Sequence, residues 1–380
     1  MNPSVPPASE QFASRPANSG QAPSFWQRVS EGRAIDDLWS QFAADTRSSY
    51  GFYGKDVDWD GVHKLPAWKR PLRIAGQLFW AMMNKLSPAR RVLLLAALVL
   101  LFLSGMHFKL DNFELFAALL LLVLLSLELV DKVIMKRDLE IAREIQAWLV
   151  PSEPPVIPGA EVAFWTRAQN SVAGDYYDAF YPLNDGASGG KLMLVTADVA
   201  GKSVPAALLM ATLQASLRTL ASEGIPLIEL AERLNRYACA HSMGGQRFTT
   251  AVIALYDTAS GHLNYVNAGH NSPVLRRSNG KTERLESSGL PLGITPEATF
   301  SSALAVLQPG DTLVLFTDGV VEAFNSAGEE FSDARWVDVI RSMPSLSAQE
   351  TLRQLMKSVE NFVGATRQSD DITCLVLQTK

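Results

Sequence analysis

Cysteine is scarce in this chain of 380 residues, with only Cys239 and Cys374 present. Two cysteines exclude a disulfide-rich miniprotein, and unpaired thiols suit a reducing cytoplasm. The sequence contains no HExxH motif and no paired CxxC motif, so a zinc site has no support. It also lacks a Walker A motif, which leaves nucleoside triphosphate chemistry without support.

Charge is scarce as well, since charged residues make up 19% of the chain, below the usual quarter. The 34 Lys and Arg residues against 39 Asp and Glu residues give a formal net charge of −5. This mild acidic balance argues against a nucleic-acid-binding protein, which normally presents a basic face. The length is sufficient for one large or two moderate domains, each with a buried core.

Two apolar runs account for the missing charge. Residues 92–105 and 115–127 contain no charged side chain. With its flanks each run reaches roughly 17–18 residues, the short end of what spans a bilayer core about 30 Å thick. Core helices of a soluble domain would be the alternative, but these usually carry a polar stripe, and neither run has one. We therefore expect a transmembrane helical hairpin over residues 91–130.

Basic residues predict the orientation of this hairpin in the membrane. They flank the hairpin on both sides, whereas only Lys109 lies between the two runs. The flanking residues are Arg70, Arg73, Lys85, Arg90, Arg91, Lys132, Lys136 and Arg137. We therefore expect a two-span protein of the inner (cytoplasmic) membrane with both termini in the cytoplasm. A signal peptide is not expected, because the first apolar run begins about ninety residues into the chain.

The segments around the hairpin differ in composition. Residues 1–24 are rich in Pro, Ser and Ala, which predicts a disordered tail. Residues 25–90 carry five Trp and predict a membrane-proximal amphipathic segment. Residues 131–158 predict a connecting signalling helix followed by a Pro-rich linker, because proline stops a helix.

Apolar residues follow a heptad-like stripe along this connecting helix. The stripe consists of Leu127, Ile134, Ile141, Ile145 and Trp148. It is compatible with a homodimer formed through the helix. It is equally compatible with a short helix that packs on its own domain.

Residues 159–380 alternate between strand-like runs and turns rich in Gly, Asn and Asp. Strands are predicted over 191–199, 248–257, 262–270, 311–320 and 372–379, and helices over 204–224, 226–242 and 347–364. The elements lack a regular βαβ alternation. An α+β architecture is therefore favoured over a doubly wound sheet.

Aspartates in this domain gather at predicted strand ends, mostly beside glycines. They are Asp175, Asp178, Asp198, Asp318, Asp370 and Asp371. Such a cluster without His or Cys ligands suits hard cations such as Mg²⁺ or Mn²⁺. Two such ions could activate water and bind phosphoryl oxygens. Taken singly, each aspartate is better explained as a turn or cap residue, and spacing alone does not show that the six converge.

Eight ordered segments resemble one known family. They are EIQAWLVPSEPP, AGDYYDAF, ADVAGKSVPAALLMA, FTTAVIALYD, YVNAGHNSPVL, GLPLGI, FTDGVVEAFNSAGEEF and SDDITCLVL. The family is that of the metal-dependent protein serine/threonine phosphatases (PPM), in its bacterial SpoIIE-like, stress-sigma-regulator branch. The resemblance covers roughly residues 139–380. It implies a central antiparallel β-sandwich flanked by helices, with a two-metal site at one end.

The resemblance also implies roles for single residues. Asp198 is similar to the carboxylate that bridges both metals, with the Val199 carbonyl as an extra ligand. Asp175 resembles the metal-site Asp of a GGD motif. Asp318 and Asp370 resemble the aspartates that hold the first metal. Among nearby acids, Asp178, Glu322 and Asp371 rank lower, and Asp371 either binds metal or holds its loop.

The mechanism that the resemblance implies is direct attack by a metal-activated water, without a phospho-enzyme. Eukaryotic relatives place a His two residues after the bridging Asp, and Ala200 occupies that position here, so the general acid is open. His270 is a candidate acid, although a structural turn residue is favoured. Lys202 could meet a phosphate or simply be solvated.

Two small residues complete these expectations. Ala173 replaces the first Gly of the GGD motif, which should alter the loop only slightly. Cys374 is expected to fill space in a core strand.

These features together predict a membrane-anchored phosphatase that uses two divalent ions, Mn²⁺ or Mg²⁺. Its expected substrate is phosphoserine or phosphothreonine on a regulatory protein, by analogy an anti-sigma-factor antagonist. One alternative is a catalytically inactive module that binds phosphoproteins in a partner-switching complex. A nucleotidyl cyclase is a further alternative, disfavoured because no triphosphate motif is present.

Overall fold

The computed structural model describes residues 54, 57–105, 112–182, 190–241, 247–286 and 288–380. The chain divides into two compact units, Met1–Val130 and Asp131–Lys380. The predicted tail over residues 1–24 lies outside the described residues, as does most of the first half of the Trp-rich segment.

The first unit contains two helices that precede the apolar runs, followed by the two apolar helices, of which the second continues into the other unit. The helices are α3 (Trp59–His63), α4 (Arg70–Lys85), α5 (Pro88–Gly105) and the first part of α6 (Phe113–Leu149). Helices α4, α5 and α6 share a small apolar cluster formed by Met83, Leu94 and Leu124. Most other large apolar side chains of α5 and of this part of α6 are exposed.

Helices α5 and α6 form an antiparallel pair. Arg90 Nη1 lies 2.9 Å from Glu128 Oε1 near the start of α5. At its other end, Ser104 Oγ donates a hydrogen bond of 2.8 Å to Glu114 Oε1. Contacts between the start of one helix and the far part of the other require opposite directions. The two predicted apolar runs therefore do form a helical hairpin.

Within the described residues, two helices are long and apolar enough to cross a bilayer, α6 and α7 (Ser203–Ala221). Helix α7 carries Met210, Leu213 and Leu217 buried in the core of the second unit. It is therefore a core helix. Helix α6 keeps only 11% of its most apolar window buried, which suits a lipid-facing surface.

Helix α6 is a single helix of 37 residues, about 55 Å long. It joins the second apolar run and the predicted connecting helix without a break, as the sequence predicted. It ends at Leu149, two residues before Pro151. A proline cannot continue a helix and disfavours helical geometry in the residue before it, which explains this end.

The second unit is a sandwich of two five-stranded sheets, in which all named strands pair antiparallel. The first sheet has the order β1-β10-β9-β6-β7, and the second has the order β2-β3-β4-β5-β8. The strands are β1 (Ala160–Arg167), β2 (Tyr176–Phe180), β3 (Lys191–Val199), β4 (Thr249–Asp257), β5 (His262–Ala268), β6 (Val274–Arg276), β7 (Thr282–Arg284), β8 (Ala303–Val306), β9 (Thr312–Phe316) and β10 (Ile372–Thr379).

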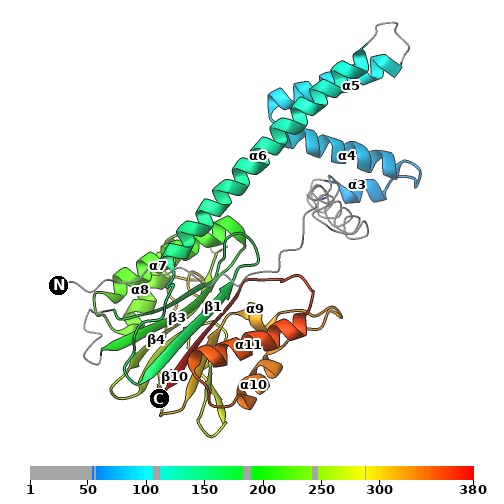
Figure 1. Cartoon of the computed structure of the whole chain (residues 1–380). Helices are drawn as coiled ribbons and strands as arrows, with labels where there is room; N and C mark the ends of the chain where they lie inside the picture. The colour runs from blue at the N-terminus through cyan, green and yellow to red at the C-terminus, as the bar shows by residue number, and fades with distance from the viewer. Residues whose placement is uncertain (1–53, 55–56, 106–111, 183–189, 242–246, 287) are drawn as a thin grey trace, which may run out of the picture. The chain divides into compact units, whose positions relative to one another are not determined.

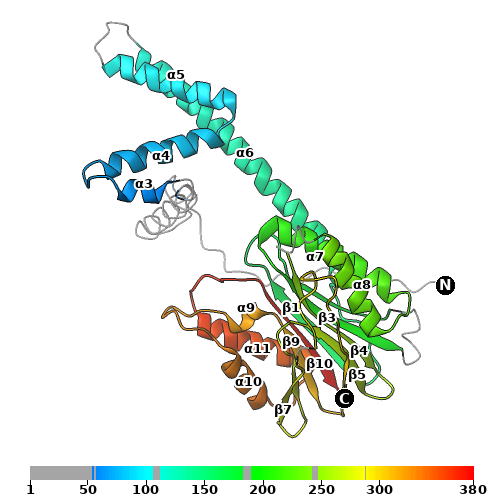
Figure 2. The ribbon, with the colours of Figure 1, turned by 180° about the vertical axis from the view of Figure 1, so that it is seen from behind.

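Helices cover both outer faces of the sandwich (Figures 1 and 2). Helix α7 and α8 (Leu227–Ala240) pack on the second sheet, whereas α9 (Asp318–Val321), α10 (Asp333–Ser342) and α11 (Ala348–Val363) lie on the side of the first. Three apolar cores result. One lies between the sheets, with Leu194, Leu315 and Leu375, and one lies under each helical layer. The predicted helix-flanked antiparallel sandwich is confirmed.

Most predicted elements agree with the structure. The strands predicted over 191–199 and 372–379 match β3 and β10. The strand predicted over 311–320 is wrong at its end, because β9 stops at Phe316 and Asp318 opens α9. An acid in the first turn favours the helix through its dipole. The very short strands β6, β7 and β8 were not predicted, since three or four residues show no usable period.

Candidate metal centre

Asp175 and Asp198 lie side by side at one end of the second sheet. Asp175 directly precedes β2, and Asp198 is the next-to-last residue of β3. The antiparallel register places Tyr176 opposite Ala197, which brings the start of β2 to the end of β3. Two acids that are far from each other in the sequence therefore become neighbours.

Asp318 and the pair Asp370–Asp371 occupy the same end of the first sheet. Strand β9 ends at Phe316, which pairs with Cys374 near the start of β10. The residues beyond these positions, 317–318 and 370–371, consequently emerge together. Asp318 begins helix α9, and Asp371 immediately precedes β10.

Thr317 connects the two sheets at this end. Its hydroxyl Oγ1 donates a 2.8 Å hydrogen bond to Asp175 Oδ2 and accepts one of 2.9 Å from the Thr373 amide. The three side chains are buried. The five acids Asp175, Asp198, Asp318, Asp370 and Asp371 therefore converge, and we call them the acid cluster.

The acids of the cluster raise one another's pKa. Burial raises the pKa of Asp198 to about 7, with further contributions from the charges of Asp318 and Asp370. Burial raises the pKa of Asp318 to about 6, together with the charges of Glu322 and Asp370. A divalent cation would offset this crowding of negative charge.

The two remaining acids with shifted values show the same effect. Burial raises the pKa of Asp175 well above its usual value, and the charge of Asp198 adds to the shift. Burial also raises the pKa of Asp371, although hydrogen bonds from backbone amides oppose this shift. The oxygen donors of the cluster are the ligand type that Mg²⁺ and Mn²⁺ prefer.

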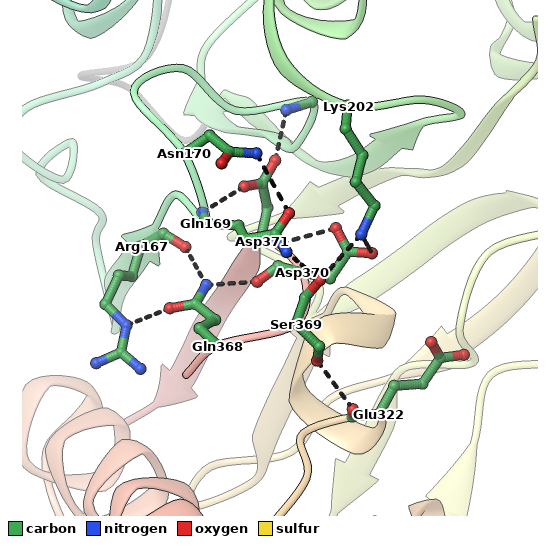
Figure 3. Close-up of polar contacts among 10 residues, drawn as sticks. Arg167, Gln169, Asn170, Lys202, Glu322, Gln368, Ser369, Asp370 and Asp371 are labelled. Atoms are coloured by element: carbon green, nitrogen blue, oxygen red, sulfur yellow. Dashed lines mark hydrogen bonds and ion pairs between the residues drawn. The ribbon is translucent and has the colours of Figure 1, made fainter. Parts of the chain in front are cut away.

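Several carboxylates of the cluster are engaged by the protein itself (Figure 3). Asp371 accepts hydrogen bonds of 2.7 Å from the amides of Gln169 and Gly174. Asp370 Oδ2 lies 2.9 Å from the Lys202 ammonium. Within the described ranges, no three His, Cys, Asp or Glu side chains are arranged to hold one metal ion as they stand. The chemistry of the donors fits a hard cation, and the assignment of individual ligands remains a prediction.

Two glycines permit the close packing of the cluster. A Cβ at Gly174 would lie 3.1 Å from the Val199 carbonyl oxygen and 3.7 Å from Asp198 Oδ1. A Cβ at Gly319 would lie 1.9 Å from the Asp371 carbonyl oxygen, which no side chain allows. Among the described residues, Ala173 is not one of those with positive φ, so the loop before Asp175 does not require a glycine there.

Asp178 lies outside the acid cluster. Its inclusion among the acids near the metal site is therefore corrected. It is fully buried and forms an ion pair with Arg218, whose Nη2 lies 2.8 Å from Asp178 Oδ1. Tyr176 donates a further hydrogen bond of 2.5 Å from its hydroxyl. Residues 176 and 178 share one face of β2, and Tyr176 packs in the core beneath α7 and α8. Asp178 is therefore a structural residue.

His270 is also separate from the acid cluster. It is buried, and its Nδ1 lies 2.8 Å from Thr250 Oγ1. Burial lowers the pKa of His270 to about 4. The structural role favoured from the sequence is therefore supported. Cys374 is fully buried in β10, as expected of a core residue.

Gln146 is a residue whose role the sequence did not reveal. Its side-chain amide donates to the Ala173 carbonyl at 2.7 Å and accepts from the Ala173 amide at 3.0 Å. These two bonds attach the last turn of α6 to the loop that carries Gly174 and Asp175. A cavity of about 440 Å³, lined in part by Gln146 and Asp175, lies beside this contact.

The raised pKa values predict a pH dependence of stability without metal. Asp198 and Asp318 titrate near 7 and 6 in the folded chain and near 4 when unfolded. Between these values the folded state holds more protons, so the stability falls as the pH rises. Neutral His270, whose pKa is lowered to about 4, has the opposite effect below about pH 6.5, so in EDTA the decrease in melting temperature should be clearest from about pH 6.5 to about pH 8.

Asp198→Asn should flatten this decrease, because one titrating carboxylate is removed. Saturating Mn²⁺ should reduce it, since a bound cation favours the ionised form. Differential scanning fluorimetry of the full chain in detergent measures both effects. A melting temperature that rises over this range in EDTA would contradict the crowding of charge described above.

Comparison with known proteins finds one family and several relatives. The family model "Stage II sporulation protein E (SpoIIE)" matches residues 188–380. Protein IcfG of Synechocystis is 27% identical over 267 residues, which cover 63% of this chain and 41% of IcfG. "Phosphoserine phosphatase RsbU" of Bacillus subtilis is 28% identical over 247 residues, which cover 64% of this chain and 71% of RsbU. The chain thus spans less than half the length of IcfG.

A solved structure shares the fold. The SiaA-PP2C domain of Pseudomonas aeruginosa superposes with a TM-score of 0.58 at 20% identity. The match covers 66% of this chain and 99% of the SiaA domain. The sandwich described above is therefore a PP2C-type fold, as the sequence resemblance implied.

Proposed function

Because the chain belongs to the Stage II sporulation protein E (SpoIIE) family, whose model matches just over half of it, we propose that it is a metal-dependent protein phosphatase. The observation that carries this proposal is the convergence of five acids from both sheets at one end of the sandwich. A buried group of like charges costs stability, so its presence suggests a functional site.

The metal ligands in this proposal are the acids of the cluster. Asp198 would contact both ions, Asp318 and Asp370 would hold the first, and Asp175 would contact metal directly or through water. The Val199 carbonyl and Asp371 are additional candidates. When bound, the two ions supply a water of lowered pKa and positive charge for the phosphoryl oxygens. Thr317 keeps Asp175 oriented, and the amides of Gln169 and Gly174 keep Asp371 oriented.

Hydrolysis of a phosphoserine peptide by the full chain in detergent tests the proposal. Phosphate release should require Mn²⁺ or Mg²⁺ and should saturate as the ion is titrated. Binding of the peptide without phosphate release at any ion concentration would instead support an inactive phosphoprotein-binding module. The presence of all four principal aspartates favours the enzyme over that module.

The substrate is proposed by analogy with relatives. RsbU is named a phosphoserine phosphatase, and we propose phosphoserine or phosphothreonine on a regulatory protein, in the class of anti-sigma-factor antagonists. Comparison of such a phosphoprotein with a phosphopeptide of the same sequence tests this. Equal kcat/KM values for both would contradict recognition of the folded partner.

We further propose that α5 and α6 anchor the chain in the inner membrane as a two-span hairpin, with the catalytic domain in the cytoplasm. Their largely exposed apolar side chains and the basic residues outside the runs support this. Alkaline extraction of membranes provides the test. Release of the chain into the soluble fraction would contradict anchoring.

The connecting part of α6 is proposed to regulate the site. Leu127, Ile134, Ile141 and Trp148 recur every seven residues and are exposed, which supports pairing with a second copy of the chain. Sedimentation of the full chain in detergent tests this pairing. A monomer at all concentrations would favour the alternative of an unpaired helix.

Gln146 provides the contact through which α6 reaches the site. Gln146→Glu removes the donor to the Ala173 carbonyl and places a charge against it. Loss of this donated hydrogen bond, about 1 kcal/mol, together with repulsion between the new carboxylate and the Ala173 carbonyl, should raise the Mn²⁺ concentration for half-maximal hydrolysis roughly tenfold. The bond accepted from the Ala173 amide can persist, because a carboxylate oxygen also accepts. Glu144→Gln, an exposed change two residues earlier on α6, is the matched control and should leave this concentration unchanged.

A further inference from the structure

Lys202 is a positively charged residue that contacts the acid cluster. Its ammonium donates hydrogen bonds of 2.9 Å to Asp370 Oδ2 and to the Ser369 carbonyl oxygen. Figure 3 shows the side chain extending from its loop toward these two residues. Charge-assisted bonds of this length are among the stronger hydrogen bonds in proteins.

The charge of Lys202 reaches the whole cluster and not only Asp370. It lowers the pKa of Asp198, Asp318 and Asp371, opposing the larger effects of burial and of neighbouring acids. Lys202 therefore lies close to four of the five acids. No other cation is among the main influences on these three groups in the described part of the chain.

The backbone fixes the position of this lysine, whereas its side chain is half exposed. Lys202 is the N-cap residue of α7, and it follows Gly201, whose φ of +120° favours glycine. Gly201 also packs against the Arg247 guanidinium, so a side chain at position 201 would collide with it. The Lys202 side chain itself is 52% exposed, so solvent reaches it beside the acid cluster.

We propose that Lys202 is an exchangeable cation, which neutralises Asp370 in the absence of metal and is released toward the substrate phosphoryl group when a divalent ion takes Asp370. The proposal rests on the function proposed above. An ammonium in contact with Asp370 and a divalent ion on the same carboxylate repel each other, so both cannot occupy it favourably. The released ammonium remains beside the acid cluster, because Lys202 lies four residues after Asp198, and it can therefore reach a phosphoryl group held by the bound ions.

The exchange is tested first by metal binding without substrate. Lys202→Met keeps most of the side-chain length and removes the competing charge. At pH 8 its Mn²⁺ dissociation constant, measured by calorimetry on the full chain in detergent, should be roughly tenfold lower than that of the wild type. Lys202→Arg keeps the charge and should bind Mn²⁺ like the wild type. Lys191→Met makes the same change at the opposite end of β3 and should have no effect.

Stability supplies a second measurement that does not depend on turnover. Lys202→Met should melt at a lower temperature than the wild type in EDTA, because the acids lose their internal counter-ion. Mn²⁺ should then raise its melting temperature by more than it raises that of the wild type. A Mn²⁺ constant unchanged by Lys202→Met would overturn the exchange.

The contact with the phosphoryl group is tested by kinetics at saturating Mn²⁺. Lys202→Met should raise KM for a phosphoserine peptide roughly tenfold, whereas Lys202→Arg should restore most of the affinity. A tighter Mn²⁺ constant with an unchanged KM would overturn the phosphoryl contact. Absence of any Mn²⁺ binding by the wild-type chain would contradict the proposed metal-dependent function as a whole, and not only the role of Lys202.

Discussion

Asp198→Asn should reduce kcat for phosphopeptide hydrolysis roughly 10³-fold, a loss of about 4 kcal/mol in transition-state stabilisation. Asp198 lies at the end of β3, and its pKa is raised by burial and by the charges of Asp318 and Asp370. An amide of the same size lacks the negative charge that Asp198 would supply as the proposed ligand of both ions. The loss should therefore persist at saturating Mn²⁺, because the remaining acids cannot position two ions in the same way.

The protein should nevertheless fold, since an uncharged residue relieves repulsion within the cluster. The melting temperature in EDTA at pH 8 should equal or exceed that of the wild type. Asp338→Asn is the matched control, because Asp338 is an exposed acid of α10 that pairs only at the surface with Arg341. It should leave kcat unchanged. A wild-type kcat in Asp198→Asn would show that the acid cluster is not the catalytic site.

Arg218→Met should destabilise the catalytic unit by about 3–5 kcal/mol, the cost of leaving a buried charge without its partner. Asp178 is fully buried, and Arg218 provides both of its guanidinium contacts, Nε and Nη2, at 2.8 Å. Methionine retains apolar contact but cannot donate. Among the described residues, the Tyr176 hydroxyl and the Ala179 amide would remain as donors to this carboxylate.

Thermal unfolding of the full chain in detergent should show this loss as a decrease of roughly 10 °C in the melting temperature of the catalytic unit. Arg341→Met removes a surface ion pair between half-exposed side chains and should change that temperature by a degree or two at most. Equal effects of both substitutions would mean that Asp178 has access to water. Asp178→Asn in the Arg218→Met background should recover part of the stability, because it removes the unpaired charge.

The sequence, with the family resemblance, was sufficient to predict the sandwich and the acids that the structure brings together at one end of it. Long runs of β-branched and aliphatic residues specify β3 and β10. The positions of Asp198 and Asp371 can then be predicted, because Asp198 lies near the end of β3 and Asp371 directly precedes β10. The family resemblance then predicted one shared role, metal binding, for Asp175, Asp198, Asp318 and Asp370. Helix α6 could also be predicted as continuous, because no proline interrupts it before Pro151.

Partners far apart in the sequence could not be predicted in the same way. In the sequence, Asp178 looked like the other acids. Its structural role becomes visible only in the fold, where its side chain points from β2 toward Arg218 of α7 and pairs with it. The contact between Thr317 and Asp175 depends on how two sheets stack, which no local pattern encodes. Gln146 and Lys202 are likewise ordinary polar residues until tertiary structure brings them to Ala173 and Asp370.

The hydroxyl of Thr317, which follows a strand of the first sheet, binds Asp175 beside the second sheet, and this link between the sheets has a consequence for biosynthesis. Neither sheet holds a complete set, and the acids extend along the chain from Asp175 to Asp371. A ribosome must therefore translate nearly the whole domain, and β10 must insert between β1 and β9, before the five acids can converge. Nascent chains that lack β10 would not bring the acids of the two sheets together, so the proposed activity could arise only after synthesis of the domain is nearly complete.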